Sequence, residues 1–203
     1  MPIRLVFLCL LFVFSGGLPA IGTAQDSSDP LLGESASGQV ATAHPIQVAP
    51  DIDGMLDEAF WAAIPVISGF LQRDPVDGAA ASERTEVRIA YTSTALYFGM
   101  TMYDSEPDLI LGNILQRGGW IDKDDNVRIA IDTYHDGRNA YLFEIGALGA
   151  QDDALISDEG GQDWNWDGIY TTEARITDEG WVLEAEIPFT TLRFDDPTSP
   201  EMG

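Results

Sequence analysis

Three of the five tryptophans lie in segments without strand or helix periodicity, where an indole ring can stay exposed. Trp120 follows two glycines, and Trp164 and Trp166 stand among acidic and amide residues. A flat aromatic face can stack on the apolar side of a ligand while neighbouring polar groups bind its hydroxyls. Trp61 and Trp181 occupy plug or periodic positions, so we expect them in the core. The loop tryptophans indicate a binding site, with packing into the fold as the alternative, above all for Trp166, which can begin a strand.

Polar side chains that could bind ligand hydroxyls stand in the same two segments. Arg117 and Asp122 flank Trp120, and Gln162 precedes Trp164. We therefore predict a site formed by the loop tryptophans together with Arg117 and Gln162.

Carboxylates gather in these loops as well, and they could hold a hard cation. With two histidines and one cysteine in the chain, calcium fits this composition better than zinc. None of the acidic runs has the spacing of an EF-hand loop. Solvated loop charge is the alternative for each cluster. The predicted metal ligands are Asp104, Asp122, Asp124 and Asp125.

Two further carboxylates, Glu184 and Glu186, alternate along one predicted strand and share its outward face. Residues at i and i+2 of a strand are about 7 Å apart, a distance that suits a glycosidase pair. Any polar strand face has the same spacing, and the chain lacks nucleophile-elbow, zinc-protease and phosphate-loop motifs. We expect no catalysis by the domain itself and no organic cofactor. If the protein is associated with an enzyme, we expect a hydrolase of O-glycosyl bonds.

The N-terminus resembles a secretory signal over residues 1–24, with Arg4, an apolar run over 5–14 and small residues before Gln25. Cys9, the only cysteine, lies inside this signal, so disulfides and thiolate chemistry are not expected in the exported chain. Without Arg4, nine basic residues face 34 acidic ones, a net charge of −25. Such a surface repels nucleic acid and anionic membranes. We expect a periplasmic, outer-membrane-associated or extracellular location.

Residues 25–44 lack periodicity and are predicted to form a flexible leader. From residue 45 onward, apolar residues alternate with polar ones in paired segments joined by turns, for example around His135-Asp-Gly137. This pattern predicts an all-β fold, an antiparallel jelly-roll-like sandwich, with a short helical turn near residues 57–63. The expected long loops, residues 105–123 and 149–167, are typical of functional segments.

The ordered motifs resemble the family 9 carbohydrate-binding modules, in particular the family-9-like N-terminal domain of large exported bacterial proteins with a C-terminal β-barrel domain of unknown function. The resemblance begins at Ile52-Asp-Gly-Met-Leu-Asp-Glu-Ala-Phe-Trp61 and ends near residue 195. The other matching segments are residues 70–75, 85–91, 96–98, 125–132, 136–138, 141–143, 166–168, 180–189 and 192–194.

The resemblance implies a module that binds a polysaccharide or oligosaccharide, holds a sugar between tryptophan rings and carries structural calcium. It implies a non-catalytic role in polysaccharide breakdown, with Trp120 and Trp164 as the stacking residues. Two alternatives stay open: a structural or assembly domain of a larger envelope β-barrel protein without a sugar site, and a glycoside hydrolase. Because the sequence given stops just after the last matched motif, we expect the domain, residues 45–203, to be truncated, with the β-barrel region missing.

Overall fold

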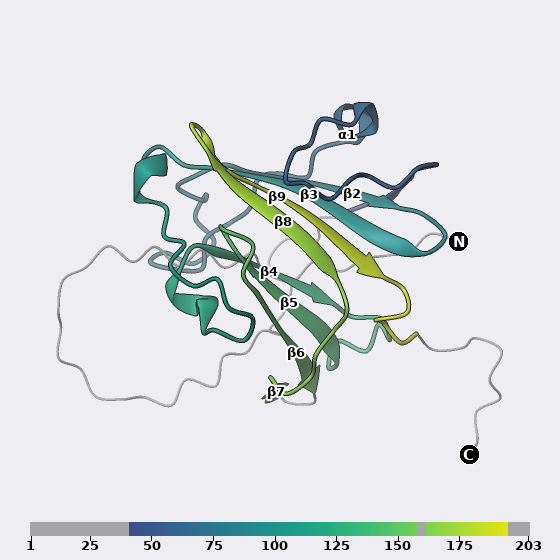
Figure 1. The fold of residues 1–203 in the computed structure, drawn as a ribbon. Helices are drawn as coiled ribbons and strands as arrows, with labels where there is room; N and C mark the ends of the chain where they lie inside the picture. The colour runs from purple at the N-terminus through teal and green to yellow at the C-terminus, as the bar shows by residue number, and fades with distance from the viewer. Residues whose placement is uncertain (1–40, 158–160, 195–203) are drawn as a thin grey trace, which may run out of the picture.

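The computed structural model describes residues 41–157 and 161–194, which form a sandwich of two β-sheets (Figure 1). The predicted signal, most of the leader and the C-terminal tail lie outside these residues. In the described part of the chain, no helix is long and apolar enough to cross a membrane. The strands are β1 (His44–Pro45), β2 (Thr85–Tyr91), β3 (Ala95–Tyr103), β4 (Asn126–Ile131), β5 (Ala140–Gly146), β6 (Gln151–Ser157), β7 (Gly161–Asp163), β8 (Thr171–Thr177) and β9 (Gly180–Pro188). The helices are α1 (Ala59–Ala63) and the 3₁₀ turns η1 (Pro107–Leu109) and η2 (Ile121–Lys123).

One sheet has the strand order β1-β2-β3-β9-β8 and the other the order β4-β5-β6-β7. Every pair is antiparallel except β1 with β2, which is parallel. The prediction of an all-β antiparallel sandwich is therefore confirmed, and the predicted helical turn is α1. The last residues of the predicted leader are part of this fold, since Ala41 is buried and β1 begins at His44.

The core lies between the sheets because alternate residues of each strand point inward. Ile89, Phe98, Ile129, Phe143 and Leu183 come from five different strands, and each is at most 1% exposed. Burying one such side chain stabilises the fold by about 1.5–3 kcal/mol. The alternation seen in the sequence thus produces one continuous core.

The segment 149–167, predicted as a long loop, contains β6 and β7 instead. The prediction was wrong because the inward positions of β6 are mostly polar. Gln151 and Asp153 point to the inner side, where both bind the guanidinium of Arg117. Only Leu155 continues the apolar inward pattern, so the sequence shows no clear alternation there.

The outer face of the five-stranded sheet is covered by the segment around α1. Trp61, 1% exposed, and Ile64 pack on Ala90, Ala95 and Tyr97 and form a second apolar cluster. Figure 1 shows α1 on the side of this sheet that faces away from the four-stranded sheet.

Glu184 lies beneath this covering segment and is fully buried. Its carboxylate accepts hydrogen bonds from the backbone N–H groups of Asp53 and Gly54, both at 3.0 Å, and from Trp61 Nε1 at 3.1 Å. Glu186 accepts from the Tyr97 hydroxyl. The two glutamates share the outer face as predicted, but the covering segment closes the space that a glycosidase substrate would need.

Candidate functional site

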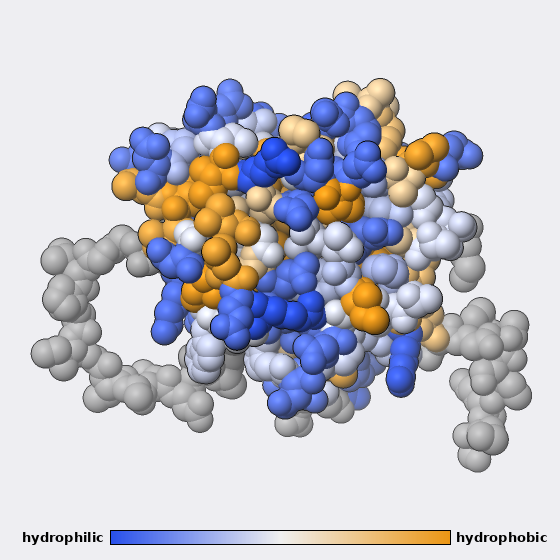
Figure 2. Space-filling model, viewed as in Figure 1, coloured by the Kyte–Doolittle hydropathy of each residue, from blue (hydrophilic) through white to orange (hydrophobic). Residues whose placement is uncertain are grey.

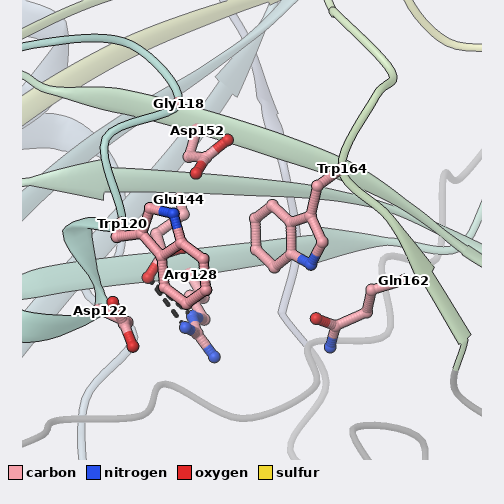
Figure 3. Close-up of a pocket in the computed structure, with 8 residues that line it drawn as sticks. All are labelled: Gly118, Trp120, Asp122, Arg128, Glu144, Asp152, Gln162 and Trp164. Atoms are coloured by element: carbon pink, nitrogen blue, oxygen red, sulfur yellow. Dashed lines mark hydrogen bonds and ion pairs between the residues drawn. The ribbon is translucent and has the colours of Figure 1, made fainter.

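A pocket of about 380 Å³ lies on the outer face of the four-stranded sheet (Figure 3). Each strand contributes one outward residue to the lining, and the loops that contain Gly118 and Trp164 close its sides. The lining consists of Gly118, Trp120, Asp122, Arg128, Glu144, Asp152, Gln162 and Trp164. Pockets that bind small molecules typically measure about 300–1,000 Å³, so this pocket suits a small ligand or one end of a longer ligand.

The floor of the pocket is a polar row that crosses three strands. The register places Arg128 of β4 opposite Glu144 of β5, and Glu144 opposite Asp152 of β6. Arg128 donates from Nε and Nη2 to Glu144 Oε1, at 3.0 and 2.9 Å. These outward positions are polar in strands whose inward positions are apolar, so the same alternation that forms the core also positions this row.

Burial controls the protonation of the floor. Glu144 is only 2% exposed, and desolvation raises its pKa above the usual value despite the attraction of Arg128. Burial likewise raises the pKa of Asp152. Both carboxylates are therefore easier to protonate than an exposed acid, and they lie where a ligand would meet them.

Two indole rings flank the pocket. Trp120 is 74% exposed and Trp164 is 40% exposed, and Figure 3 shows their rings beside one another, with Gln162 on the Trp164 side. The rings come from different segments, the residue before η2 and the turn after β7. Exposed aromatic rings next to a polar floor provide both the apolar and the polar contacts that a sugar ring requires.

Trp120 has a left-handed backbone, with φ 57° and ψ 53°. This conformation costs a non-glycine residue about 1–2 kcal/mol, and such strain persists only where the surroundings impose it. Asp124, 5% exposed, anchors the preceding segment, since its carboxylate accepts from the backbone N–H groups of Asn113 and Ile114 and from Asn113 Nδ2. The exposed ring of Trp120 is thus held by a well-bonded loop.

Of the predicted ligand-binding residues, the structure brings Trp120, Trp164 and Gln162 together in the pocket. Arg117 and Trp166 lie elsewhere. Arg117 donates to Asp153 and to the Gly168 carbonyl, on the inner side of the sheet. Each therefore has contacts within the fold that account for its position.

Trp166 packs against aromatic rings of the inner layer. Its ring centroid lies 5.2 Å from that of Tyr141 and 5.9 Å from that of Phe143. The structural alternative for this tryptophan agrees with these contacts.

The four predicted calcium ligands do not converge on one point. Asp122 faces the pocket, whereas Asp124 and Asp125 bind backbone N–H groups of residues 111–114. Asp104 accepts from the N–H of Glu106. Within residues 41–157 and 161–194, no group of three or more His, Cys, Asp or Glu side chains is arranged to hold a metal ion. These four residues therefore do not fit a shared site, and calcium binding stays a prediction without assigned ligands.

Sequence reasoning missed Arg128, Glu144 and Asp152. For the first two a signal was present, because a charged residue interrupts each of two apolar strands at an outward position. The hairpin turn between those strands sets the register that pairs them. Asp152 could not be found in this way because its strand was not recognised.

The fold and the pocket define a β-sandwich protein with an open binding site flanked by tryptophans. Residues 52–202 match the family model described as carbohydrate family 9 binding domain-like, and the chain belongs to this family. The predicted resemblance is thereby confirmed.

Solved structures share the fold at low sequence identity. A candidate carbohydrate-binding protein from Bacteroides uniformis is 14% identical, with a TM-score of 0.56 over 73% of this chain and 72% of the other. A family 9 carbohydrate-binding module from Caldicellulosiruptor kristjanssonii, in complex with cellotriose, is 16% identical, with a TM-score of 0.49 over 72% of this chain and 67% of the other. A complex of a family 9 module from the same organism with glucose gives 16%, 0.48, 72% and 66%. No curated protein matches this chain.

Proposed function

We propose that this protein binds a polysaccharide or oligosaccharide in the pocket between Trp120 and Trp164. The observation that carries the proposal is the pair of exposed indole rings beside a polar floor in a pocket of about 380 Å³. Membership of the carbohydrate family 9 binding domain-like family supports it. The size of the pocket favours recognition of a few sugar units rather than a long stretch of chain.

Each part of the lining has a role in this proposal. The indole faces stack on the apolar faces of a pyranose, and such contacts are strong when water is excluded. Arg128, Glu144 and Asp152 on the floor and Gln162 at the side exchange hydrogen bonds with the sugar hydroxyls. Because the Arg128–Glu144 pair is already formed, the floor is preorganised and loses little conformational entropy on binding.

Calorimetric titration with cello- and xylo-oligosaccharides tests the proposal. Trp120→Ala and Trp164→Ala should each weaken binding by about tenfold or more, the scale of stacking on one aromatic ring. Leu115→Ala is the matched control, because Leu115 is 69% exposed and lies in the same loop as Trp120 but not in the pocket. Absence of binding to any glycan, or an equal loss in the control, would contradict the proposal.

The wider role follows the same inference. As a non-catalytic part of an exported glycan-degrading protein, the domain would keep its partner enzyme on the substrate. The isolated chain should then bind insoluble polysaccharide without releasing reducing sugar. Cell fractionation with an antibody against the chain would test export.

An assembly domain is the second candidate function, and an exposed apolar surface favours it. Leu109, Leu111, Leu115 and Leu148 are all exposed, and the packing of Leu148 against Gly112 joins the last of them to the others. Figure 2 shows apolar residues gathered on the side of the molecule that carries η1. Exposed apolar patches mark protein contacts in many proteins. A failure of every glycan to bind, combined with protection of these leucines in a larger protein, would favour this function.

A further inference from the structure

The charges of the pocket lining are unbalanced. Asp122, Glu144 and Asp152 contribute three carboxylates, and Arg128 contributes the single guanidinium. At neutral pH the lining therefore has an excess of two negative charges. A binding site that needs only to hydrogen-bond neutral hydroxyls does not require this excess.

The guanidinium is not available to an anionic ligand. Arg128 donates from both Nε and Nη2 to one oxygen of Glu144, which is 2% exposed. If an incoming carboxylate drew Arg128 away, Glu144 would become a buried charge without a partner, which is strongly unfavourable. The pair therefore acts as a neutral unit of the floor.

The other two carboxylates have no such partner. In the part of the chain that the structure describes, neither Asp122 nor Asp152 forms an ion pair. The nearby Arg117 is paired with Asp153 on the inner side of the sheet. Asp152 is half-buried and accepts a hydrogen bond from the Asp153 N–H, whereas Asp122 is exposed. A ligand in the pocket thus meets two uncompensated carboxylates.

We propose that the pocket selects saccharides by charge, taking a cationic amino sugar in preference to the matched neutral sugar and excluding uronic acids. The proposal rests on the function proposed above and specifies its substrate class. An ammonium group about 4 Å from one carboxylate should improve binding about five- to tenfold, the scale of one partly screened charge pair. A uronate carboxylate at the same place should weaken binding by a similar factor. The net charge of the whole chain, −24, acts in the same direction over longer distances.

The test is calorimetric titration of the full chain with four β-1,4-linked disaccharides. They are cellobiose, the glucosamine disaccharide, its neutral N-acetylated form, and a disaccharide of glucuronic acid and glucose. The pH is chosen so that the amines are protonated and the carboxylates are ionised. We expect the glucosamine disaccharide to bind most tightly and the uronate most weakly, with both differences shrinking as salt is added. The N-acetylated form separates the effect of charge from that of a substituent at the same carbon.

The carboxylates responsible are tested by substitution. The double variant Asp122→Asn, Asp152→Asn should bind the charged and neutral disaccharides with similar affinity, while binding of cellobiose changes little. Asp178→Asn, in the exposed turn between β8 and β9, changes the net charge of the chain away from the pocket and should leave the preference intact.

The outcomes separate this proposal from the function on which it rests. Equal affinity for all four disaccharides would overturn selection by charge and leave carbohydrate binding standing. Tightest binding of the uronate would also overturn it, and would mean that Arg128 leaves Glu144 for the ligand. Absence of binding by all four would overturn both.

Discussion

Each sheet of the sandwich carries a buried glutamate on its outer face, and the two have opposite surroundings. Glu184 of β9 is closed off by the segment that contains Trp61 and accepts hydrogen bonds from two backbone N–H groups and an indole. Glu144 of β5 accepts from Arg128 and lines an open pocket beside Trp120. The same elements, a carboxylate and tryptophan on a sheet face, thus form an internal anchor in one place and a binding site in the other.

The difference lies in what covers the sheet. On the five-stranded sheet, Gly99 lets the covering segment approach closely, since a Cβ at this position would lie 2.7 Å from Leu56 Cδ2. On the four-stranded sheet, the rings of Trp120 and Trp164 stay at the rim and leave the floor accessible. A carboxylate on a sheet therefore becomes structural or functional according to the segment that packs over it.

Trp61→Ala should have the largest effect on stability. Removing a tryptophan that is 1% exposed leaves a cavity under the covering segment and should lower the free energy of unfolding by about 3–5 kcal/mol. Urea denaturation measures this change. Saccharide affinity of the folded variant should stay within about threefold of the original, because the pocket is on the other sheet.

Trp164→Ala is the matched control for this comparison. It removes the same side chain from a position that is 40% exposed and should have a much smaller effect on stability, with a large effect on binding. Equal destabilisation by the two variants would show that the two faces do not differ as described.

Glu184→Gln should lower the free energy of unfolding by about 1–3 kcal/mol at neutral pH, because an amide cannot accept at both positions that the carboxylate serves. The effect should depend on pH. Burial raises the pKa of Glu184 above its usual value, so the folded state binds a proton more readily than the unfolded chain. The resulting contribution to stability is full below the unfolded-state pKa and is lost as the pH rises through the folded-state pKa.

Urea denaturation across this pH interval checks the sign. The original protein should lose stability relative to Glu184→Gln as the pH rises, and saccharide affinity should not change. If the two proteins keep a constant difference at every pH, Glu184 does not titrate in this interval, and the raised pKa is refuted.

Asp124→Asn tests the anchor of the Trp120 loop. The substitution removes one acceptor oxygen from a buried group that binds Asn113 and Ile114, and should lower the free energy of unfolding by about 1–2 kcal/mol. Binding should weaken a few-fold because the ring of Trp120 loses its fixed position. Asp108→Asn, an exposed change in η1, is the control. An unchanged affinity would show that Asp124 does not position the ring.

Much of the fold was predictable because its strands alternate apolar and polar residues. The β4–β5 hairpin was found from this alternation and from the turn that contains His135 and Gly137, both of which have positive φ. The strands β6 and β7 were not, because a strand whose inner face binds an arginine lacks the expected pattern. A buried ion pair inside the fold is therefore what sequence periodicity failed to detect.

The site was predictable only in part, for a related reason. Tryptophans in irregular segments were identified from composition alone, and Trp120 and Trp164 do line one pocket. The floor depends on a cross-strand register that joins Glu144 to Arg128 and to Asp152. Covering is also a tertiary property, which is why Glu184 looked as accessible as Glu144 in the sequence.

Trp120→Asn should produce the smallest change in stability and separates the strain at the rim from the stacking that it supports. Asparagine adopts the left-handed conformation more easily than other non-glycine residues, so this variant should be more stable than Trp120→Ala by about 0.5–1 kcal/mol. Both variants should lose saccharide binding equally, since neither has an aromatic ring. Urea denaturation and calorimetry measure the two effects on the same samples. Equal stability of the two variants would mean that the backbone relaxes when the indole is removed; the ring, rather than the loop anchored by Asp124, would then impose the left-handed conformation.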